Sequence, residues 1–399
     1  MRSRTVVHVI TRLDRGGSAQ NTLLTALGHD QTRFEPVVVA GRAGRWNDQG
    51  GDEATDECCR RLESAGIRCL LVPTLTRQIH PLKDLATLGA LVSLLRRERP
   101  TIVHTHTSKA GVLGRLAARI AGVPVLIHTP HGHVFYGHFN RAASWLFLQI
   151  ERALARLTTH MIALTEAERE EHLARRVGRP DCFSVVPSGI DVDRFRRVAG
   201  LFGRRPPELG CPPDAIVAGS VGWLTEVKGH RFLIEALARL KPFHPRLHVL
   251  IVGSGALRDE YTALAKRLGV AETVHLVGER QDVPDCLAAM DLFILPSLNE
   301  GMCRALVEAM AAGRPVIATR VGGVPAVVED RRTGILVPPG DASALAEGID
   351  ELIRRPDFAK ALGDAASESI GSRFGVQAMV RAIEEVYDRA LGVEGVPEP

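Results

Sequence analysis

The feature that most constrains the fold is an alternation of short apolar runs with longer amphipathic stretches, which occurs twice along the chain. In the first half, the apolar runs lie at Val6–Ile10, Pro36–Ala40, Thr101–Thr105 and Pro124–Thr129. Runs this short and this continuously apolar are typical of parallel strands buried on both faces. Because helical stretches separate them, the first half is predicted to form a doubly wound α/β domain.

The second half repeats the pattern and predicts a second domain of the same class. We expect an N-terminal Rossmann-like domain over 1–190, a Pro-, Gly- and Arg-rich connection over 191–213, and a second Rossmann-like domain over 214–375. A last helix is predicted over 376–392. The predicted strands of the second half are Ala215–Val221, Leu247–Val252, Val274–Val277, Leu292–Pro296 and Val316–Thr319.

Composition narrows the class of protein. Hydrophobic residues make up 45%, charged residues 24% and aromatic residues 5%, which is typical of a globular protein with an aliphatic core. No apolar run reaches the ~18 residues of a membrane-spanning helix. His8 interrupts the first apolar run and Arg12 follows it, so this run is interpreted as a strand rather than a signal peptide. A cytoplasmic protein is expected.

Net charge and cysteine content argue against a nucleic-acid-binding protein, a disulfide-rich protein and a zinc protein. A net charge of +4 does not indicate a nucleic-acid partner, although weak attraction to the inner face of the cytoplasmic membrane stays open. The seven cysteines are odd in number and no two have C-x-x-C spacing, so neither a disulfide framework nor a zinc motif is expected. This fits a reducing compartment.

Glycines follow two of the predicted strands, at the edge where α/β sheets bind ligands. Gly16 and Gly17 precede a helix, where backbone amides favour phosphate; the alternative is a tight turn that requires positive φ. Gly253 and Gly255 also follow a strand, but Arg258 stands where a dinucleotide-binding motif has its third glycine. Binding of NAD is therefore not expected.

Histidines gather near the ends of two strands of the first half. His104 and His106 alternate on one strand and so share a face, and His131 follows the next strand. Histidines on one face of a strand could bind zinc, but no cysteine lies nearby and no metalloenzyme motif is present. We predict no metal ligands and interpret His131 as a substrate contact; the alternative is a histidine that caps local backbone.

The second half carries a lysine and two glutamates at strand ends. Lys228 lies between glycines before a helix, where it could contact a diphosphate. Glu300 lies on the loop after a strand. Glu308 lies in a helix that is apolar on nearly every side, and a buried carboxylate requires partners. Ribose hydroxyls would serve, and an internal salt bridge is the alternative.

At this point the sequence resembles a known family, the retaining GT-B glycosyltransferases of family GT4, over nearly its whole length. The seven residues between Glu300 and Glu308 match that family's E-x7-E signature. The resemblance also rests on the segments 222–229, 253–258 and 322–325, on 186–195 at the domain junction, and on 104–111 and 131–133. The last two resemble members that act on polysaccharides and lipid-linked glycans.

The resemblance implies a fold and a set of roles. Two Rossmann-like domains would face each other across a cleft, and the C-terminal helix would cross back to the N-terminal domain. His131, Glu300 and Lys228 would be the catalytic residues, with His131 and Glu300 near the donor sugar. The implied donor-binding residues are Gly16, Gly17, Lys228, Gly253, Gly255, Glu300, Gly301, Met302, Cys303, Arg304 and Glu308.

The implied reaction is transfer of a hexose or N-acetylhexosamine from a nucleotide-diphosphate sugar, with retention of configuration. UDP-sugars are favoured as donors and GDP-mannose is next. The acceptor would be a glycan or a lipid-linked glycan, and no cofactor is obligatory. Cations and amide dipoles at the leaving diphosphate would stabilise the charge that grows there. Two alternatives stay open: a GT-B-like sugar-nucleotide epimerase or hydrolase, and a catalytically silent partner in glycan assembly.

Several positions depart from the family pattern. Trp223 stands where the family usually has an arginine, and Arg304 is the candidate to replace it at the diphosphate. Asp191 and Asp193 match the D-x-D of metal-dependent transferases, but they lie at the domain junction and are interpreted as structural. The helical stretch 140–156 mixes apolar bulk with arginine; it is interpreted as a core helix or as a membrane-surface helix.

Overall fold

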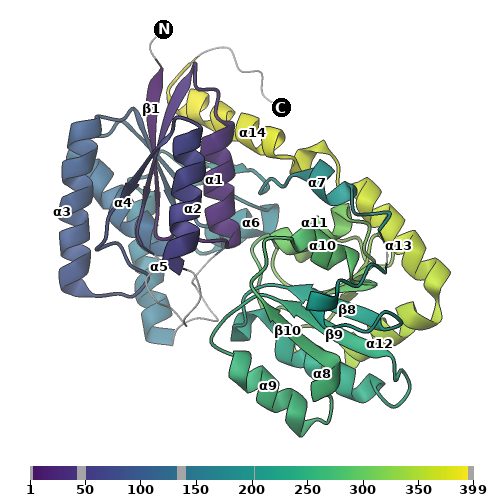
Figure 1. Ribbon diagram of the computed structural model, residues 1–399. Helices are drawn as coiled ribbons and strands as arrows, with labels where there is room; N and C mark the ends of the chain where they lie inside the picture. The colour runs from purple at the N-terminus through teal and green to yellow at the C-terminus, as the bar shows by residue number, and fades with distance from the viewer. Residues whose placement is uncertain (1–2, 43–50, 133–140, 202, 394–399) are drawn as a thin grey trace. The chain divides into compact units, whose positions relative to one another are not determined.

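The computed structural model describes residues 3–42, 51–132, 141–201 and 203–393. The chain forms two compact units, one comprising Met1–Gly189 with Val376–Pro399 and the other Ile190–Gly375 (Figure 1). Each unit is a parallel sheet with helices packed on it, and each is described by itself.

The sheet of the first unit is parallel throughout and runs in the order β3-β2-β1-β4-β5-β6-β7. β1 is an interior strand between β2 and β4, so that His8 pairs with Val38 on one side and His104 on the other. The strands are β1 (Arg4–Ile10), β2 (Phe34–Ala40), β3 (Arg68–Leu71), β4 (Ile102–His106), β5 (Val125–Thr129), β6 (His160–Ala163) and β7 (Phe183–Val185).

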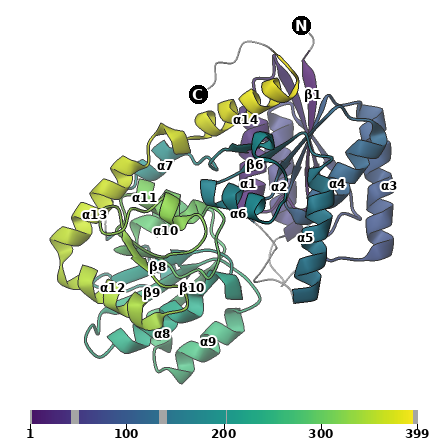
Figure 2. The same cartoon turned by 180° about the vertical axis from the view of Figure 1, so that it is seen from behind.

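Helices cover both faces of this sheet (Figures 1 and 2). α3 and α4 pack on one face, and α1, α2 and α14 pack on the other. The helices of this unit are α1 (Gly17–Gly28), α2 (Gly51–Ser64), α3 (Pro81–Glu98), α4 (Ser108–Ala121), α5 (Arg141–Ala155), α6 (Glu166–Ala174) and α14 (Val376–Ala390).

The last helix, α14, belongs to the first unit although the second unit precedes it in the chain. Its apolar residues recur at the three- and four-residue spacing of one helical face. Met379, Ile383 and Tyr387 on this face are buried against residues of β1, β2 and β4. This packing brings the polar residue Glu384, also buried, to the interior of the first unit.

The second unit has a parallel sheet in the order β10-β9-β8-β11-β12-β13. Its strands are β8 (Ile216–Val221), β9 (Leu247–Val252), β10 (Val274–Gly278), β11 (Leu292–Leu295), β12 (Val316–Thr319) and β13 (Ile335–Val337). Its helices are α7 (Val192–Arg196), α8 (His230–Leu240), α9 (Arg258–Arg267), α10 (Val283–Ala288), α11 (Arg304–Ala311), α12 (Ala342–Arg354) and α13 (Pro356–Ser369).

The segment 191–213 groups with the second unit and begins with α7. The Asp191 side chain accepts a hydrogen bond from the backbone N–H of Arg194 at 3.0 Å. It is therefore the N-cap of α7, since it satisfies an amide of the first turn that has no partner within the helix.

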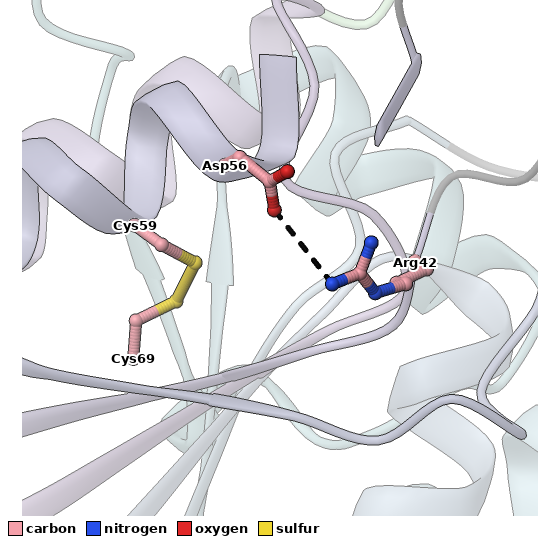
Figure 3. The surroundings of a disulfide bond; sticks show 4 residues. All are labelled: Arg42, Asp56, Cys59 and Cys69. Carbon is pink, nitrogen blue, oxygen red and sulfur yellow. Dashed lines mark ion pairs between the residues drawn. A yellow bond between two sulfur atoms is a disulfide. The ribbon is translucent and has the colours of Figure 1, made fainter. Parts of the chain in front are cut away.

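Two expectations about the first unit are wrong. The polar, Gly-rich stretch 41–56 predicts a loop from sequence alone, but α2 already begins at Gly51, because Ala54, Cys58 and Leu62 recur on one buried face. Cysteine pairing was not expected, yet Cys59 on α2 and Cys69 on β3 form a disulfide (Figure 3). Counting cysteines could not find it, because the pairing depends on how α2 packs beside β3.

Helix α5 has a buried acidic side chain on one face and exposed apolar side chains elsewhere. Glu151 is buried and accepts two hydrogen bonds from the buried Arg115 of α4, at 2.9 and 2.8 Å. On the same helix, the side chains of Trp145 and Leu146 are exposed. The helix therefore anchors one face in the unit and leaves apolar surface uncovered. Among the described residues, no helix is long and apolar enough to cross a membrane.

The disulfide predicts a dependence of stability on reductant. Cys59 and Cys69 are separated by 10 residues, and closing a loop of this length in the unfolded chain stabilises the fold by about 2–3 kcal/mol. Dithiothreitol should therefore lower the free energy of unfolding measured in urea by that amount. The double variant Cys59→Ser/Cys69→Ser is the control and should not respond to reductant. Equal stability of the wild-type chain with and without reductant would contradict the prediction.

Candidate functional site

Lys228 and Glu300 form an ion pair at the carboxyl edge of the second sheet. Lys228 Nζ lies 2.7 Å from Glu300 Oε1, and the Ser297 hydroxyl donates to the same oxygen at 2.7 Å. Lys228 follows β8 and Glu300 follows β11, which are neighbours in the sheet. Burial alone would lower the pKa of Lys228, but the Glu300 carboxylate outweighs it and raises that pKa. The ammonium is therefore held charged.

Glycines hold the two loops of this pair against each other. A Cβ on Gly229, where φ is +65°, would lie 2.1 Å from the carbonyl oxygen of Pro296. A Cβ on Gly322 would lie 1.8 Å from the carbonyl oxygen of Glu300, and the Gly323 N–H donates to the carbonyl of Gly301 at 3.0 Å. No other residue fits at 229 or 322 without moving the backbone beside Glu300.

Glu308 is paired within its own helix. Arg304 Nε donates to Glu308 Oε1 at 2.7 Å, across one turn of α11. Of the two partners that the sequence left open for Glu308, the internal salt bridge is the one present. Arg304 Nη1 is buried and has no hydrogen-bond partner among the described residues. A buried guanidinium nitrogen without a partner is costly, so this donor is available for an anionic or hydroxyl ligand.

Cys303 lies at the start of α11, close enough to both ion pairs to be influenced by their charges. It is buried at the N-cap of α11, and its thiol has a pKa raised to about 12 by burial and by the nearby Glu300. The charge of Lys228 acts to lower the pKa of this thiol, and that of Glu308 acts to raise it. Cys303 follows Gly301 and Met302, and because α11 follows β11, the N-terminus of α11 lies at the same edge of the sheet.

Gly253 and Gly255 lie where the next loop approaches the Lys228 loop. A Cβ on Gly253 would lie 2.0 Å from the carbonyl oxygen of Gly222, and one on Gly255 would lie 2.5 Å from that of Leu224. These glycines are required by contact between two loops of the protein itself. The structure therefore explains both glycines by the close packing of these two loops and not by contact with a ligand.

Gly16 and Gly17 begin α1 in the first unit. Gly16 is extended, with φ of −69°, and its N–H donates to Asp14 Oδ1 at 2.8 Å. A Cβ on Gly17 would meet nothing within 4 Å. The tight turn with positive φ is therefore absent at this helix start, and the fold itself does not require a glycine at 17. Open space beside a helix N-terminus fits close approach of a ligand.

His131 lies after β5 and is half-buried. It adopts a positive φ of 58°, and its Nε2 lies 3.0 Å from Nδ1 of His106. Among the described residues, its hydrogen-bond partner is another histidine. Burial lowers the pKa of His131 to about 3, so the ring is neutral near pH 7. His133, part of the same sequence segment, lies outside the described residues.

His106 is one of a larger set of buried imidazoles that the sequence only partly revealed. His104 and His106 share a face of β4 as expected from alternation. His8 on β1 and His29 after α1 join them, and neither was recognised as a site residue. His8 could have been identified from the sequence, because its polar ring interrupts the otherwise apolar strand β1.

The only group of possible metal ligands among the described residues is His8, His104 and His106, whose ligand atoms lie within 4.8 Å of one another. Both ring nitrogens of His104 already have partners, the Tyr387 hydroxyl at 2.7 Å and the Thr129 hydroxyl at 2.8 Å. His8 and His106 are hydrogen-bonded to each other at 3.1 Å. These nitrogens are satisfied by the protein without an ion.

Comparison with known proteins places this arrangement in a family. Residues 204–369 match the family model of glycosyl transferases group 1, and residues 16–189 match that of the glycosyl transferase 4-like domain. The chain belongs to the group 1 glycosyltransferases. It is therefore a transferase, and the resemblance found in its motifs to GT4-like enzymes is confirmed.

Curated relatives of this glycosyltransferase act on different substrates. The UDP-Gal:alpha-D-GlcNAc-diphosphoundecaprenol alpha-1,3-galactosyltransferase of Escherichia coli is 31% identical over 326 residues, which are 80% of this chain and 84% of that one. A D-inositol 3-phosphate glycosyltransferase of Streptomyces scabiei is 33% identical, over 73% of this chain and 68% of that one.

Solved structures show the same fold. HepE of Anabaena, in complex with UDP and glucose, is similar with a TM-score of 0.79 and 24% identity, over 97% of this chain and 100% of that one. WaaG, a glycosyltransferase of lipopolysaccharide biosynthesis, has a TM-score of 0.71 and 19% identity, over 98% and 100%. The two Rossmann-like domains are thus those of a GT-B glycosyltransferase, as the sequence predicted.

The buried imidazoles of this glycosyltransferase predict loss of stability in mild acid. Burial holds the pKa of His8, His104, His106 and His128 well below 6.5. Below pH 6.5 the unfolded chain takes up protons on these rings and the folded chain does not, so stability is present above pH 6.5 and falls below it. Each ring contributes about 1 kcal/mol between pH 6.5 and 5.5, hence about 4 kcal/mol for the four.

Urea unfolding at pH 7.5, 6.5 and 5.5 measures this loss. The free energy of unfolding should fall by about 1 kcal/mol between pH 7.5 and 6.5 and by about 4 kcal/mol between pH 6.5 and 5.5. A flat profile down to pH 5.5 would show that these imidazoles are not held neutral by the fold.

Proposed function

We propose that this glycosyltransferase moves a hexose or N-acetylhexosamine from a nucleotide-diphosphate sugar to a glycan or lipid-linked acceptor, with retention of configuration. A UDP-sugar is the preferred donor and GDP-mannose the next. The observation that carries the proposal is the set of donors at the carboxyl edge of the second sheet: the charged Lys228 ammonium beside Glu300, and Nη1 of Arg304 at the start of α11, which has no hydrogen-bond partner among the described residues. Such a set of donors suits a diphosphate.

Each group has a role in the proposed reaction. Lys228 and Arg304 bind the diphosphate and stabilise the charge that develops on it as the sugar bond breaks. Amides of Gly301, Met302 and Cys303, and those of Gly16 and Gly17 at α1, contribute further dipoles. Gly253 and Gly255 support the Lys228 loop by their close contact with its backbone.

The carboxylates and His131 act on the sugars. Glu300 fixes Lys228 and lies beside the donor sugar. Glu308 binds the ribose through the oxygen that Arg304 does not occupy, since only Oε1 is in that ion pair. His131 contacts the donor sugar and aligns it. No metal is required in this scheme, because the protein supplies the cations at the diphosphate.

The names of the relatives support the substrate class. The relative from Escherichia coli uses UDP-galactose and a diphosphoundecaprenol-linked sugar, and HepE was solved with UDP and glucose. A lipid-linked acceptor would bring the enzyme to the cytoplasmic face of the membrane, and the exposed Trp145 and Leu146 of α5 are suited to an interfacial contact. The Cys59–Cys69 disulfide does not favour a cytoplasmic location, since such bonds persist mainly in oxidising compartments.

A screen of nucleotide sugars tests the function. UDP-galactose, UDP-glucose, UDP-N-acetylglucosamine and GDP-mannose are compared by thermal shift, because a ligand that binds only the folded state raises Tm. We expect a UDP-sugar to give the largest shift and Lys228→Ala to abolish it, while Lys228→Arg keeps part of it. The same sugar should release UDP when the enzyme turns over. If no nucleotide sugar shifts Tm of the wild-type chain, the proposal is wrong.

Arg304 is the proposed replacement for the arginine that Trp223 displaces. Arg304→Lys keeps a cation opposite Glu308 but removes the second donor nitrogen. A hydrogen bond between charged groups is lost, so donor affinity should fall about ten- to hundredfold, while Tm without ligand changes little. Isothermal titration with UDP measures this affinity. Unchanged affinity in Arg304→Lys and in Arg304→Ala would exclude Arg304 from the diphosphate site.

A further inference from the structure

A continuous chain of side-chain hydrogen bonds crosses the interior of the first unit, from His131 to the last helix. His131 Nε2 lies 3.0 Å from His106 Nδ1, and His106 Nε2 lies 3.1 Å from His8 Nδ1. His8 Nε2 lies 3.2 Å from His29 Nε2, and His29 Nδ1 lies 3.0 Å from Glu384 Oε1. We call these five residues the histidine chain.

The histidine chain joins five separate elements, so no local motif accounts for it. His131 follows β5, His106 ends β4, and His8 is in the interior strand β1. His29 directly follows α1, and Glu384 is on α14, which packs beside α1 (Figures 1 and 2). His8, His106 and the His29 side chain have no exposed surface.

Each ring within the chain can hold only one proton if it is neutral. Burial lowers the pKa of His8 and His106 well below 6.5 and that of His131 to about 3. A neutral imidazole has one N–H donor and one acceptor nitrogen. In a row of hydrogen-bonded imidazoles, all the donors must therefore point the same way along the row.

Glu384 determines which way they point. Its Oε1 also accepts from the backbone N–H of Asp30 at 2.9 Å, and its Oε2 lies 3.4 Å from Nη1 of Arg33. An amide N–H and a guanidinium can only donate, so Glu384 is the acceptor in both of these contacts, and its Oε1 is shared between the Asp30 amide and the His29 ring. His29 must therefore carry its proton on Nδ1.

For a His29 that carries only this one proton, the remaining assignments follow link by link. With its proton on Nδ1, His29 accepts at Nε2, so His8 donates from Nε2 and accepts at Nδ1. His106 then donates from Nε2 to His8 and accepts at Nδ1, so His131 donates from Nε2. The free Nδ1 of His131 is left as an unprotonated acceptor, and it has no partner among the described residues.

We propose that Glu384, together with His29, is a positioning residue that fixes the tautomer of His131 through the histidine chain. Its effect is to present an unprotonated Nδ1 to the ligand, so that His131 accepts a hydrogen bond from a sugar hydroxyl rather than donating one. This role in sugar recognition rests on the proposed function, whereas the tautomer itself does not. The inference extends the site to a residue on the last helix of the chain.

Asp388 and His104 lie beside the histidine chain and have hydrogen-bond partners of their own. Asp388 accepts hydrogen bonds from Arg33 and from Arg4, and this leaves Arg33 shared between two carboxylates beside His29. His104 stacks on His106 with ring centroids 4.1 Å apart, but it bonds to Tyr387 and Thr129 and so lies outside the chain.

Nitrogen NMR of histidine-labelled protein tests the proposal directly, because protonated and unprotonated ring nitrogens have well-separated 15N frequencies. Signals are assigned by single His→Gln variants. In the wild-type chain at pH 7.5 we expect His29 protonated on Nδ1 and His8, His106 and His131 protonated on Nε2. A doubly protonated His29 would force every donor the other way and place the proton of His131 on Nδ1, which would overturn the proposal. So would zinc or another metal bound to the purified protein at His8 and His106.

Two variants of Glu384 separate the chain's direction from charge and packing. Glu384→Gln keeps a carbonyl oxygen that can accept from His29 and Asp30, so His131 should keep its tautomer. Glu384→Leu removes the acceptor at similar volume, so His131 should show both tautomers. If His131 remains purely Nε2-protonated in Glu384→Leu, Glu384 does not set the tautomer.

Turnover then connects the tautomer to the reaction. The rate of UDP release from the sugar chosen by the donor screen should fall in Glu384→Leu in proportion to the lost Nε2-protonated population, about tenfold if a tenth remains. The fall should appear in kcat, with Glu384→Gln close to the wild-type chain. A purely structural role would lower Tm without this proportionality. Absence of any turnover would count against the proposed function, while the NMR result would still decide the tautomer.

Discussion

The parallel pairing of strands is the constraint on which both candidate sites depend. Because β8 and β11 are parallel neighbours, their carboxyl ends lie at one edge, and Lys228 reaches Glu300 across it. In the first unit, the register of β1 with β4 places His8 opposite His104 and brings His106 within hydrogen-bond distance of His8. Loops can vary, but these polar contacts require that the strands keep their register.

Buried charge is handled differently in the two units. In the second unit, Lys228 stays charged because Glu300 lies beside it, and Arg304 is paired with Glu308 through Nε while its Nη1 has no partner among the described residues. In the first unit, the imidazoles stay neutral and satisfy one another. Neutral groups avoid the desolvation cost of buried ions, but they must divide donors and acceptors along a row. A single carboxylate at the end of that row is then enough to orient all of it.

Sequence patterns predicted the parts of this protein that are periodic and local. Short apolar runs located most of the strands, and strand-end positions located Lys228, Glu300 and His131. The helix pattern of α11 showed that Glu308 must have a partner, but not that Arg304, one turn earlier, provides it. α2 was missed because its start lies in a polar, Gly-rich stretch, and the Cys59–Cys69 pair was missed with it. A contact between elements far apart in the chain, such as Cys59–Cys69, leaves no periodic pattern in the sequence from which it could be predicted.

The role argued for Glu384 also explains why α14 returns to the first unit with a polar residue on its buried face. An apolar residue at that position would leave the Asp30 amide and the His29 ring without an acceptor. Unsatisfied buried donors destabilise a fold more than a satisfied network stabilises it. Glu384 thus serves the stability of the helix contact and, through four rings, the chemistry available at His131.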